Sequence, residues 1–158
     1  MGRARSYDVI EYRNKIMIEI LEDENIVSLM DSTLDTAQDD LYYQYMFPHE
    51  FIPDTETKTH KYINFDLRAD IDTRNRTYKN ITLWFFVLCH NDVIRTSRGC
   101  WYDRVVCELD NIFGEQNVLG VGKMSLVSNV PYKPNNRFTG RVLTFTVKEF
   151  TDGLKNGK

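Results

Sequence analysis

The stretch that decides the fold is Ile81–His90, which reads ITLWFFVLCH. Successive side chains of a strand point to opposite faces, so this stretch has two apolar sets, one on each face. One set is Ile81, Leu83, Phe85, Val87 and Cys89, and the other is Trp84, Phe86 and Leu88. A strand that is apolar on both faces has to be covered on both sides. The rest of the chain is therefore expected to supply two covers.

Three further segments are predicted to be strands. Residues 60–69 alternate between apolar and polar side chains, and two more strands are expected over 118–128 and 140–150, separated by the turn Pro131–Pro134. The charged residues 70–79 are typical of a hairpin tip between the first two strands. We predict that the four strands form a mostly antiparallel sheet.

Three segments have the spacing of helices. Apolar residues recur at steps of three and four in 7–22, for which Ser6 is a candidate N-cap, and again in 101–113 before Gly114. A shorter helix is expected over 23–30. The order α-α-β-β-α-β-β predicts one α+β domain over residues 1–158, with the helices packed on one face of the sheet. The polar tail 151–158 is expected to be frayed.

Residues 31–58 form a long arm without regular periodicity, polar first and then aromatic. A stretch of this length in a compact domain is usually a functional arm or a partly ordered loop. If the helices cover the Phe85 face, the Trp84 face needs a second cover, and either the arm or a neighbouring subunit would serve. The candidate interface residues are Tyr43, Tyr45, Phe47, Phe51, Trp84, Phe86 and Leu88.

The charge balance argues against a dedicated nucleic-acid binder. The chain has 158 residues, with 20 basic and 23 acidic side chains and a net charge of −3, whereas nucleic-acid-binding domains are usually strongly basic. Arg95 and Arg98 flank one loop. Basic residues also gather around the predicted hairpin tip, where they define a candidate loop facing a lumen or a partner. They are Arg68, Arg74, Arg76 and Lys79.

The sequence predicts a protein made and folded in a reducing cytoplasm. No apolar stretch follows the basic N-terminus, as a secretion signal would require, and the longest apolar run, Leu83–Cys89, is too short to span a membrane. The three cysteines have no disulfide-framework spacing. With His90 they match no closed zinc site, and Cys89 and Cys107 are expected on apolar faces.

Two fragments of catalytic motifs each lack a necessary residue. Gly120-Val-Gly122-Lys123 resembles the end of a phosphate-binding loop, but positions 117 and 124 are Asn and Met where Gly and Ser or Thr are needed. His49-Glu50 begins a zinc-protease pattern, but position 53 is Pro in place of the second His. We predict no active site, no metal and no cofactor.

Two functions from other classes remain as alternatives. Asp54, Glu56 and Lys58 are the residue types of a small magnesium-dependent nuclease, although they occur in one short loop and not on neighbouring strands. A small-molecule-binding domain with Trp84 and Phe86 as a pocket wall is the other alternative.

Several stretches resemble small neck and tail proteins of bacteriophages. They are HKYINFD at 60–66, NITLWFFVLCH at 80–90, LDNIF at 109–113, Gly120-Val-Gly122, PYKP at 131–134 and FTGR at 138–141 followed by a strand. In layout, residues 7–150 are similar to the tail terminator, or tail completion, proteins of long-tailed phages. The arm at 31–58 departs from that pattern.

The resemblance implies a structural virion protein without catalytic groups. Such α+β subunits assemble into a ring, often a hexamer, at the neck, where the ring caps the tail tube and helps to join it to the head. The implied partners are further copies of the chain, the tail tube protein and the head connector protein. DNA passes through without specific binding, and no membrane is involved. A head-completion or connector protein of the same neck is the nearest alternative.

Overall fold

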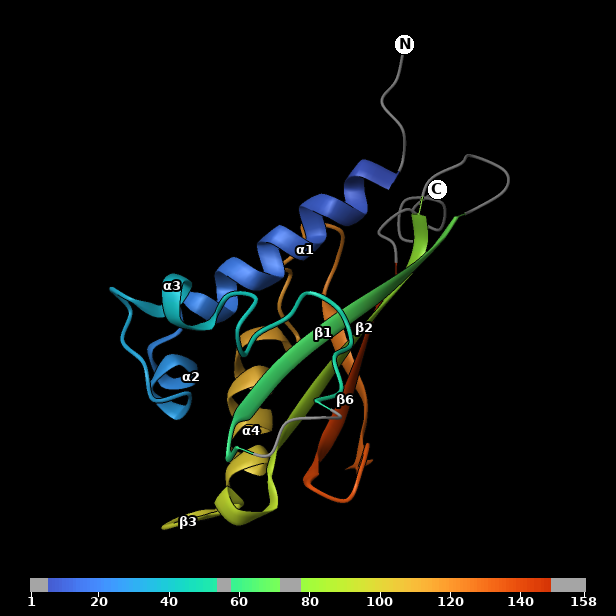
Figure 1. Cartoon of the computed structure of the whole chain (residues 1–158). Helices are drawn as coiled ribbons and strands as arrows, with labels where there is room; N and C mark the ends of the chain where they lie inside the picture. The colour runs from blue at the N-terminus through green and yellow to red at the C-terminus, as the bar shows by residue number, and fades with distance from the viewer. Residues whose placement is uncertain (1–5, 54–57, 72–77, 149–158) are drawn as a thin grey trace, which may run out of the picture.

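The computed structural model describes residues 6–53, 58–71 and 78–148. Four strands form one antiparallel sheet in the order β1-β2-β6-β5 (Figure 1). The strands are β1 (Lys61–Ile71), β2 (Tyr78–His90), β5 (Met124–Tyr132) and β6 (Phe138–Lys148). The prediction of an α+β fold with a four-stranded antiparallel sheet is therefore confirmed.

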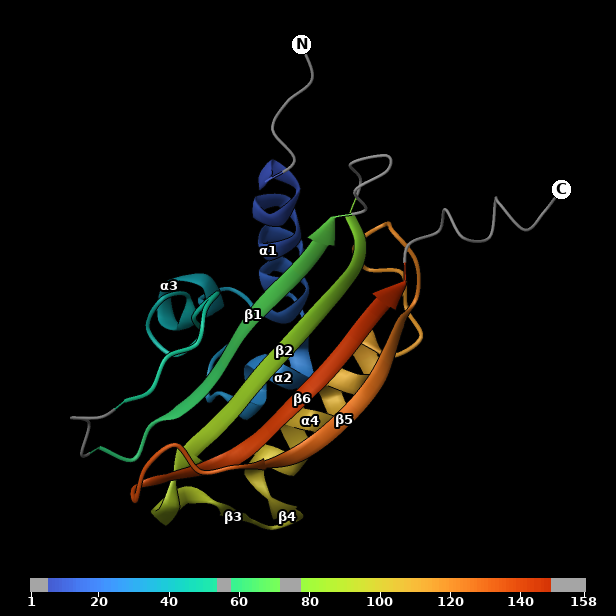
Figure 2. The same cartoon turned by 90° about the vertical axis from the view of Figure 1, so that its right-hand side faces the viewer.

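Helices cover one face of this sheet, as the sequence predicted. Helices α1 (Ser6–Leu21), α2 (Glu24–Leu29) and α4 (Trp101–Phe113) lie on the same side of it, and the short α3 (Ala37–Leu41) lies beside β1 (Figure 2). The helices begin and end within about two residues of the predicted positions, which is the usual uncertainty of helix ends.

The core lies between the sheet and these helices. Phe85 of β2 is at its centre, with its ring centroid 6.1 Å from Phe65, 5.0 Å from Phe113 of α4 and 6.1 Å from Phe145. All four rings are fully buried. The indole N–H of Trp101 is satisfied as well, since it donates to the carbonyl of Leu29 at 2.8 Å and joins α4 to the end of α2.

The structure corrects the sequence analysis at both ends of one strand. β5 begins at Met124 and not at residue 118, and it continues to Tyr132, so Pro131 lies within the strand and not in the predicted turn. The preceding loop contains Gly120 (φ 79°) and Gly122 (φ 135°), backbone conformations that an extended strand does not contain. The Asn117 side chain accepts a hydrogen bond from the Gly122 N–H at 3.0 Å and holds this loop in a turn.

Two further elements were not predicted from the sequence. The arm contains α3, and a short hairpin separates β2 from α4. The hairpin consists of the 3-10 turn η1 (Asn91–Val93) followed by β3 (Arg95–Thr96) and β4 (Gly99–Cys100). Gly99 has φ 105° and supplies the left-handed conformation that this tight turn requires. The frayed tail predicted at 151–158 lies outside the described residues.

Candidate interaction surface

The outer face of the sheet, opposite the helices, is divided into a covered half and an open half. In the covered half, Tyr62 of β1, Leu88 of β2 and Phe138 of β6 are buried. Three aromatic side chains of the arm pack over this half, namely Tyr45, Phe47 and Phe51. Phe47 stacks on Phe51 at 4.3 Å between ring centroids. The arm itself is thus the second cover that the apolar strand requires here.

Backbone hydrogen bonds fasten the arm along the free edge of β1. The N–H of Ile63 donates to the carbonyl of Tyr45, and the N–H of Phe65 donates to the carbonyl of Phe47, both at 3.0 Å. Between them the fully buried Asn64 accepts from the Phe47 N–H at 3.2 Å and donates to the Phe51 carbonyl at 3.1 Å. The β1 edge is therefore closed by the chain's own main chain.

Helix α1 adds a second fastening at this edge. The Arg13 guanidinium donates to a carboxylate oxygen of Asp66 on β1 at 2.7 Å and also to the carbonyl of Pro48 in the arm. One side chain therefore joins the helix layer, the edge strand and the arm. Arg13 and Asp66 are each about one third exposed, so this ion pair lies at the surface.

The open half runs from the centre of the outer face to β5. Val142 of β6 is paired in register with Phe86 on one side and with Val130 of β5 on the other. Val130 is 45% exposed, and Trp84 is partly exposed one step further along β2. The arm's aromatic cluster does not include Trp84.

The β5 edge continues this apolar area. Val127 at this edge is 58% exposed, and the strand, MSLVSNVPY, has no charged residue. Leu126, 42% exposed, is paired with the buried Phe145 and therefore faces the helix side. On the free side of the strand, Met124 donates to the Gln116 carbonyl and accepts from the Glu115 N–H, and residues 125–131 have no backbone–backbone hydrogen bond within the described chain. We call Trp84, Val127, Val130 and Val142 the open surface.

Two features of β5 restrict strand pairing at this edge. The register shifts between Leu126 and Ser128, which makes Val127 a β-bulge, and Pro131 has no N–H to donate. Bulges and prolines of this kind protect edge strands from pairing with other chains. A partner would consequently meet the open surface mainly through side chains.

The predicted interface residues are distributed over both halves. Trp84 lies in the open half, whereas Phe86 and Leu88 pack with the arm residues Tyr45, Phe47 and Phe51 in the covered half. Tyr43 is 48% exposed and lies beside Phe47, with 6.1 Å between ring centroids. The residues that sequence reasoning missed are those of β5 and Val142, although the absence of charge in β5 is a signal that was available.

The predicted basic loop is only partly described. Arg68 is exposed and pairs with Asp70 of the same strand at 3.0 Å. Arg74, Arg76 and the side chain of Lys79 lie outside the described residues, as do Asp54 and Glu56 of the nuclease alternative.

The cysteines differ strongly in their surroundings. Cys89 is fully buried in the core, and burial raises the pKa of its thiol to about 12, which keeps it protonated and unreactive at neutral pH. The expectation that Cys107 lies on an apolar face is wrong, because it is exposed on the outer side of α4. In the parts of the chain that the structure describes, no three His, Cys, Asp or Glu side chains are grouped so that they could hold a metal ion.

The fold and its surface define a small α+β domain whose sheet face is half closed by its own arm. A family model named YomW matches residues 21–147, which extend from the end of α1 through the arm and almost to the end of β6. The chain therefore belongs to the YomW family. No curated protein matches it. No helix among the described residues is long and apolar enough to cross a membrane.

Proposed function

We propose that this protein is a structural virion subunit that forms a ring at the head–tail junction of a long-tailed phage. In this role the ring caps the tail tube and helps to join it to the head. The observation that supports the proposal is the open surface, an uncharged and largely apolar area beside a face that the arm has already closed.

An exposed apolar area of this kind favours docking of a protein. Contiguous apolar patches on small domains usually mark sites where another protein binds. The bulge at Val127 and Pro131 disfavour an extended strand ladder, so a shaped protein surface fits better here than an extended peptide. We assign the open surface to the tail tube protein, whose end the ring would cover.

The experiment compares the wild-type chain with two variants that carry the same added charge. Val127→Arg/Val130→Arg places two cations on the open surface, and Ile10→Arg/Ile18→Arg places two on similarly exposed apolar side chains of α1, on the helix side of the sheet. Light scattering gives the mass of each protein, and electron microscopy gives the length of tail tubes assembled from the phage's tube protein in its presence.

We expect the wild-type chain and Ile10→Arg/Ile18→Arg to limit tube length and to be visible as a ring at tube ends. The Val127→Arg/Val130→Arg variant should fold normally, because both valines are about half exposed, but it should leave the tubes to grow. Tubes of equal length with and without the wild-type chain would refute the proposal. Capping by the Val127→Arg/Val130→Arg variant would refute the assignment of the open surface.

A further inference from the structure

The described residues separate charge into two regions. Residues 6–53, which contain α1, α2 and α3, have eleven Asp and Glu but only two Lys and Arg. Residues 58–71 and 78–148 have twelve Lys and Arg against seven Asp and Glu. The near-neutral total therefore conceals one acidic and one basic region.

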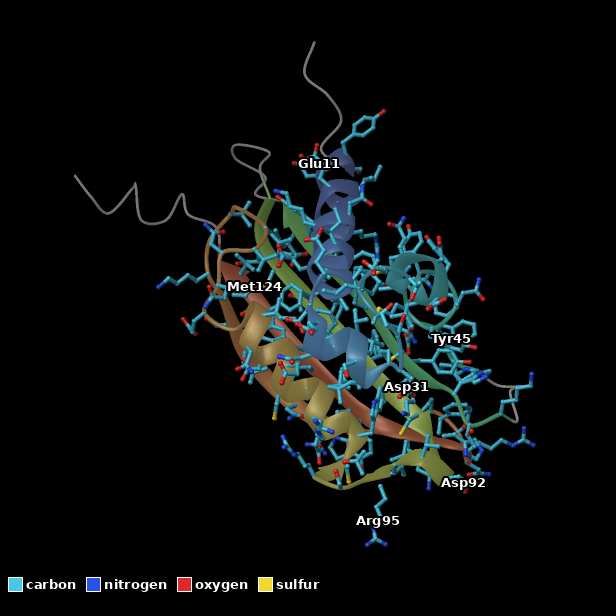
Figure 3. The ribbon with its side chains drawn as sticks, turned by 90° about the vertical axis from the view of Figure 1, so that its left-hand side faces the viewer. Glu11, Asp31, Tyr45, Asp92, Arg95 and Met124 are labelled. Carbon is cyan, nitrogen blue, oxygen red and sulfur yellow. The ribbon has the colours of Figure 1, made fainter. Side chains whose placement is uncertain are left out.

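The basic region is concentrated at the end of the molecule that carries the β3–β4 hairpin. Arg95 and Arg98 extend from the hairpin, Arg104 from the start of α4 and Lys133 from the β5–β6 loop, whose neighbouring residues are bonded to η1 through Asn91. None of these four cations has a carboxylate partner among the described residues. Figure 3 shows Arg95 projecting away from the ribbon at this end.

The hairpin presents its arginines on a fixed support. The Thr96 hydroxyl donates to the Gly99 carbonyl at 2.7 Å and accepts from the Arg98 N–H at 3.2 Å. The N–H of Trp101 donates to the Ile94 carbonyl at 2.8 Å and closes the base of the hairpin. Less conformational freedom is therefore lost when these arginines bind a partner.

The acidic region contains a hollow between α2 and the loop that follows it. This hollow borders the hairpin end, because Ser28 lines both it and a second hollow that Arg98 lines. The volume of the α2 hollow is about 420 Å³, and Glu24 and Asp35 contribute carboxylates to it beside the half-exposed Leu34. Both carboxylates are exposed, and neither pairs with a cation within the described residues. The hollow is large enough for a long side chain, and a guanidinium binds carboxylates through charge-assisted hydrogen bonds.

We propose that the β3–β4 hairpin of one copy docks in the α2 hollow of the next copy, with Arg95 and Arg98 facing Glu24 and Asp35. This inference rests on the proposed ring and specifies the contact between its subunits. The two surfaces consist of different residues, so the contact is heterologous, and repeated heterologous contacts close into rings where the rotation between copies permits. The open surface stays available for the tube.

A second copy suits both regions better than nucleic acid does. DNA would satisfy the four cations but would be repelled by the acidic flank. Another copy supplies a complement for each region at once, and charge complementarity of this kind selects the partner and its orientation.

The test reverses each side of the contact separately. Arg95→Glu/Arg98→Glu reverses the charge of the hairpin, and Glu24→Lys/Asp35→Lys reverses the charge of the hollow. Lys123→Glu is the control, because it reverses the charge of an exposed side chain away from both surfaces. Sedimentation velocity measures assembly of each protein alone, and of the two reversed variants mixed in equal amounts, with and without the tube protein. Circular dichroism checks that each variant is folded.

We expect the wild type and Lys123→Glu to form the ring, and the wild-type contact to weaken at least about tenfold between about 0.05 M and 0.5 M salt. Each reversed variant alone should stay monomeric, and the mixture should assemble again, because every contact in it joins opposite charges. Rescue by mixing cannot arise from a misfolded variant.

Four outcomes would overturn the inference. Rings formed by both reversed variants alone would leave the proposed function intact and refute this contact. Failure of the folded variants to assemble when mixed would do the same. The basic end would be a nucleic-acid surface instead if the hairpin variant assembles normally but, unlike the wild type, fails to retard duplex DNA in a gel. A wild-type chain that stays monomeric even with the tube protein would refute both the contact and the ring.

Discussion

The two edges of the sheet are treated in opposite ways. At the β1 edge, the arm supplies carbonyls to the strand, Asn64 fastens the arm from within, and Arg13 fastens it from outside. At the β5 edge, residues 125–131 have no backbone–backbone hydrogen bond on the free side within the described chain. A bulge and a proline protect this edge in place of a cover.

The comparison separates stability from recognition. Residues at the closed edge are buried and hydrogen-bonded, so their replacement should lower the free energy of unfolding. Residues at the open edge are half exposed, so their replacement should change binding with little effect on folding. The following predictions test this separation.

The largest difference is expected between Phe138 and Val130. Phe138→Ala empties a fully buried position under the arm and should lower the free energy of unfolding by about 3–5 kcal/mol. Val130→Ala on the open half should cost at most about 0.5 kcal/mol, since the side chain is 45% exposed. Urea denaturation followed by circular dichroism measures both. Equal losses would contradict the division of the face.

The substitution of Asn by Ala can be compared at a buried and at an exposed position. Asn64→Ala leaves the Phe47 N–H and the Phe51 carbonyl without their partner in a buried place, which should cost about 1–3 kcal/mol. Asn129→Ala removes only an exposed contact with Arg141 near the β5 edge and should cost less than about 0.5 kcal/mol.

Hydrogen exchange locates the effect of Asn64→Ala. The Ile63 and Phe65 amides, which the arm protects, should exchange faster in this variant, while amides of the β2–β6 pairing should be affected less. Unchanged protection at Ile63 and Phe65 would show that the arm does not depend on Asn64.

The Arg13–Asp66 ion pair should contribute less to stability than Phe138 or Asn64. Because both groups are partly exposed, a double-mutant cycle with Arg13→Ala and Asp66→Ala should give a coupling of about 0.2–1 kcal/mol, decreasing with added salt. A coupling energy that does not change with salt would mean that the two residues are coupled through the packing of the arm and not through their charges.

The smallest effect on stability is expected for Pro131→Ala at the open edge. The free energy of unfolding should change by at most about 0.5 kcal/mol, but a longer run of β5 becomes able to pair with another strand. Light scattering during prolonged incubation should show faster aggregation than in the wild type. Identical time courses would mean that the bulge at Val127 protects the edge alone.

The spacing of apolar residues was sufficient to predict the helices and strands that bury a continuous apolar stripe. The both-sided apolar pattern of Ile81–His90 predicted a strand with two covers, and the stripe over 101–113 predicted α4 with its bounds. Both predictions depend on local spacing, which tertiary contacts did not override here.

The division of the outer face could not be predicted in this way. Whether the arm covers its own sheet depends on Asn64, whose partners Phe47 and Phe51 belong to the irregular arm. A polar residue within an alternating strand is ordinary in sequence, and only its burial distinguishes it. The open surface was likewise hidden, because the expected position of β5 was shifted by the two left-handed glycines before it.

The aromatic cluster under the arm also bears on the order of folding. The β1–β2 and β5–β6 hairpins pair residues close in sequence, whereas the β2–β6 seam joins Asn80 to Lys148 and His90 to Phe138. Contacts that distant in sequence form slowly. Since the arm packs on Tyr62, Leu88 and Phe138 from three strands, its complete docking site exists only after the seam has closed. Because the arm docks last, its contacts stabilise the folded state without helping to form it. Removing these contacts should therefore raise the unfolding rate more than it lowers the folding rate.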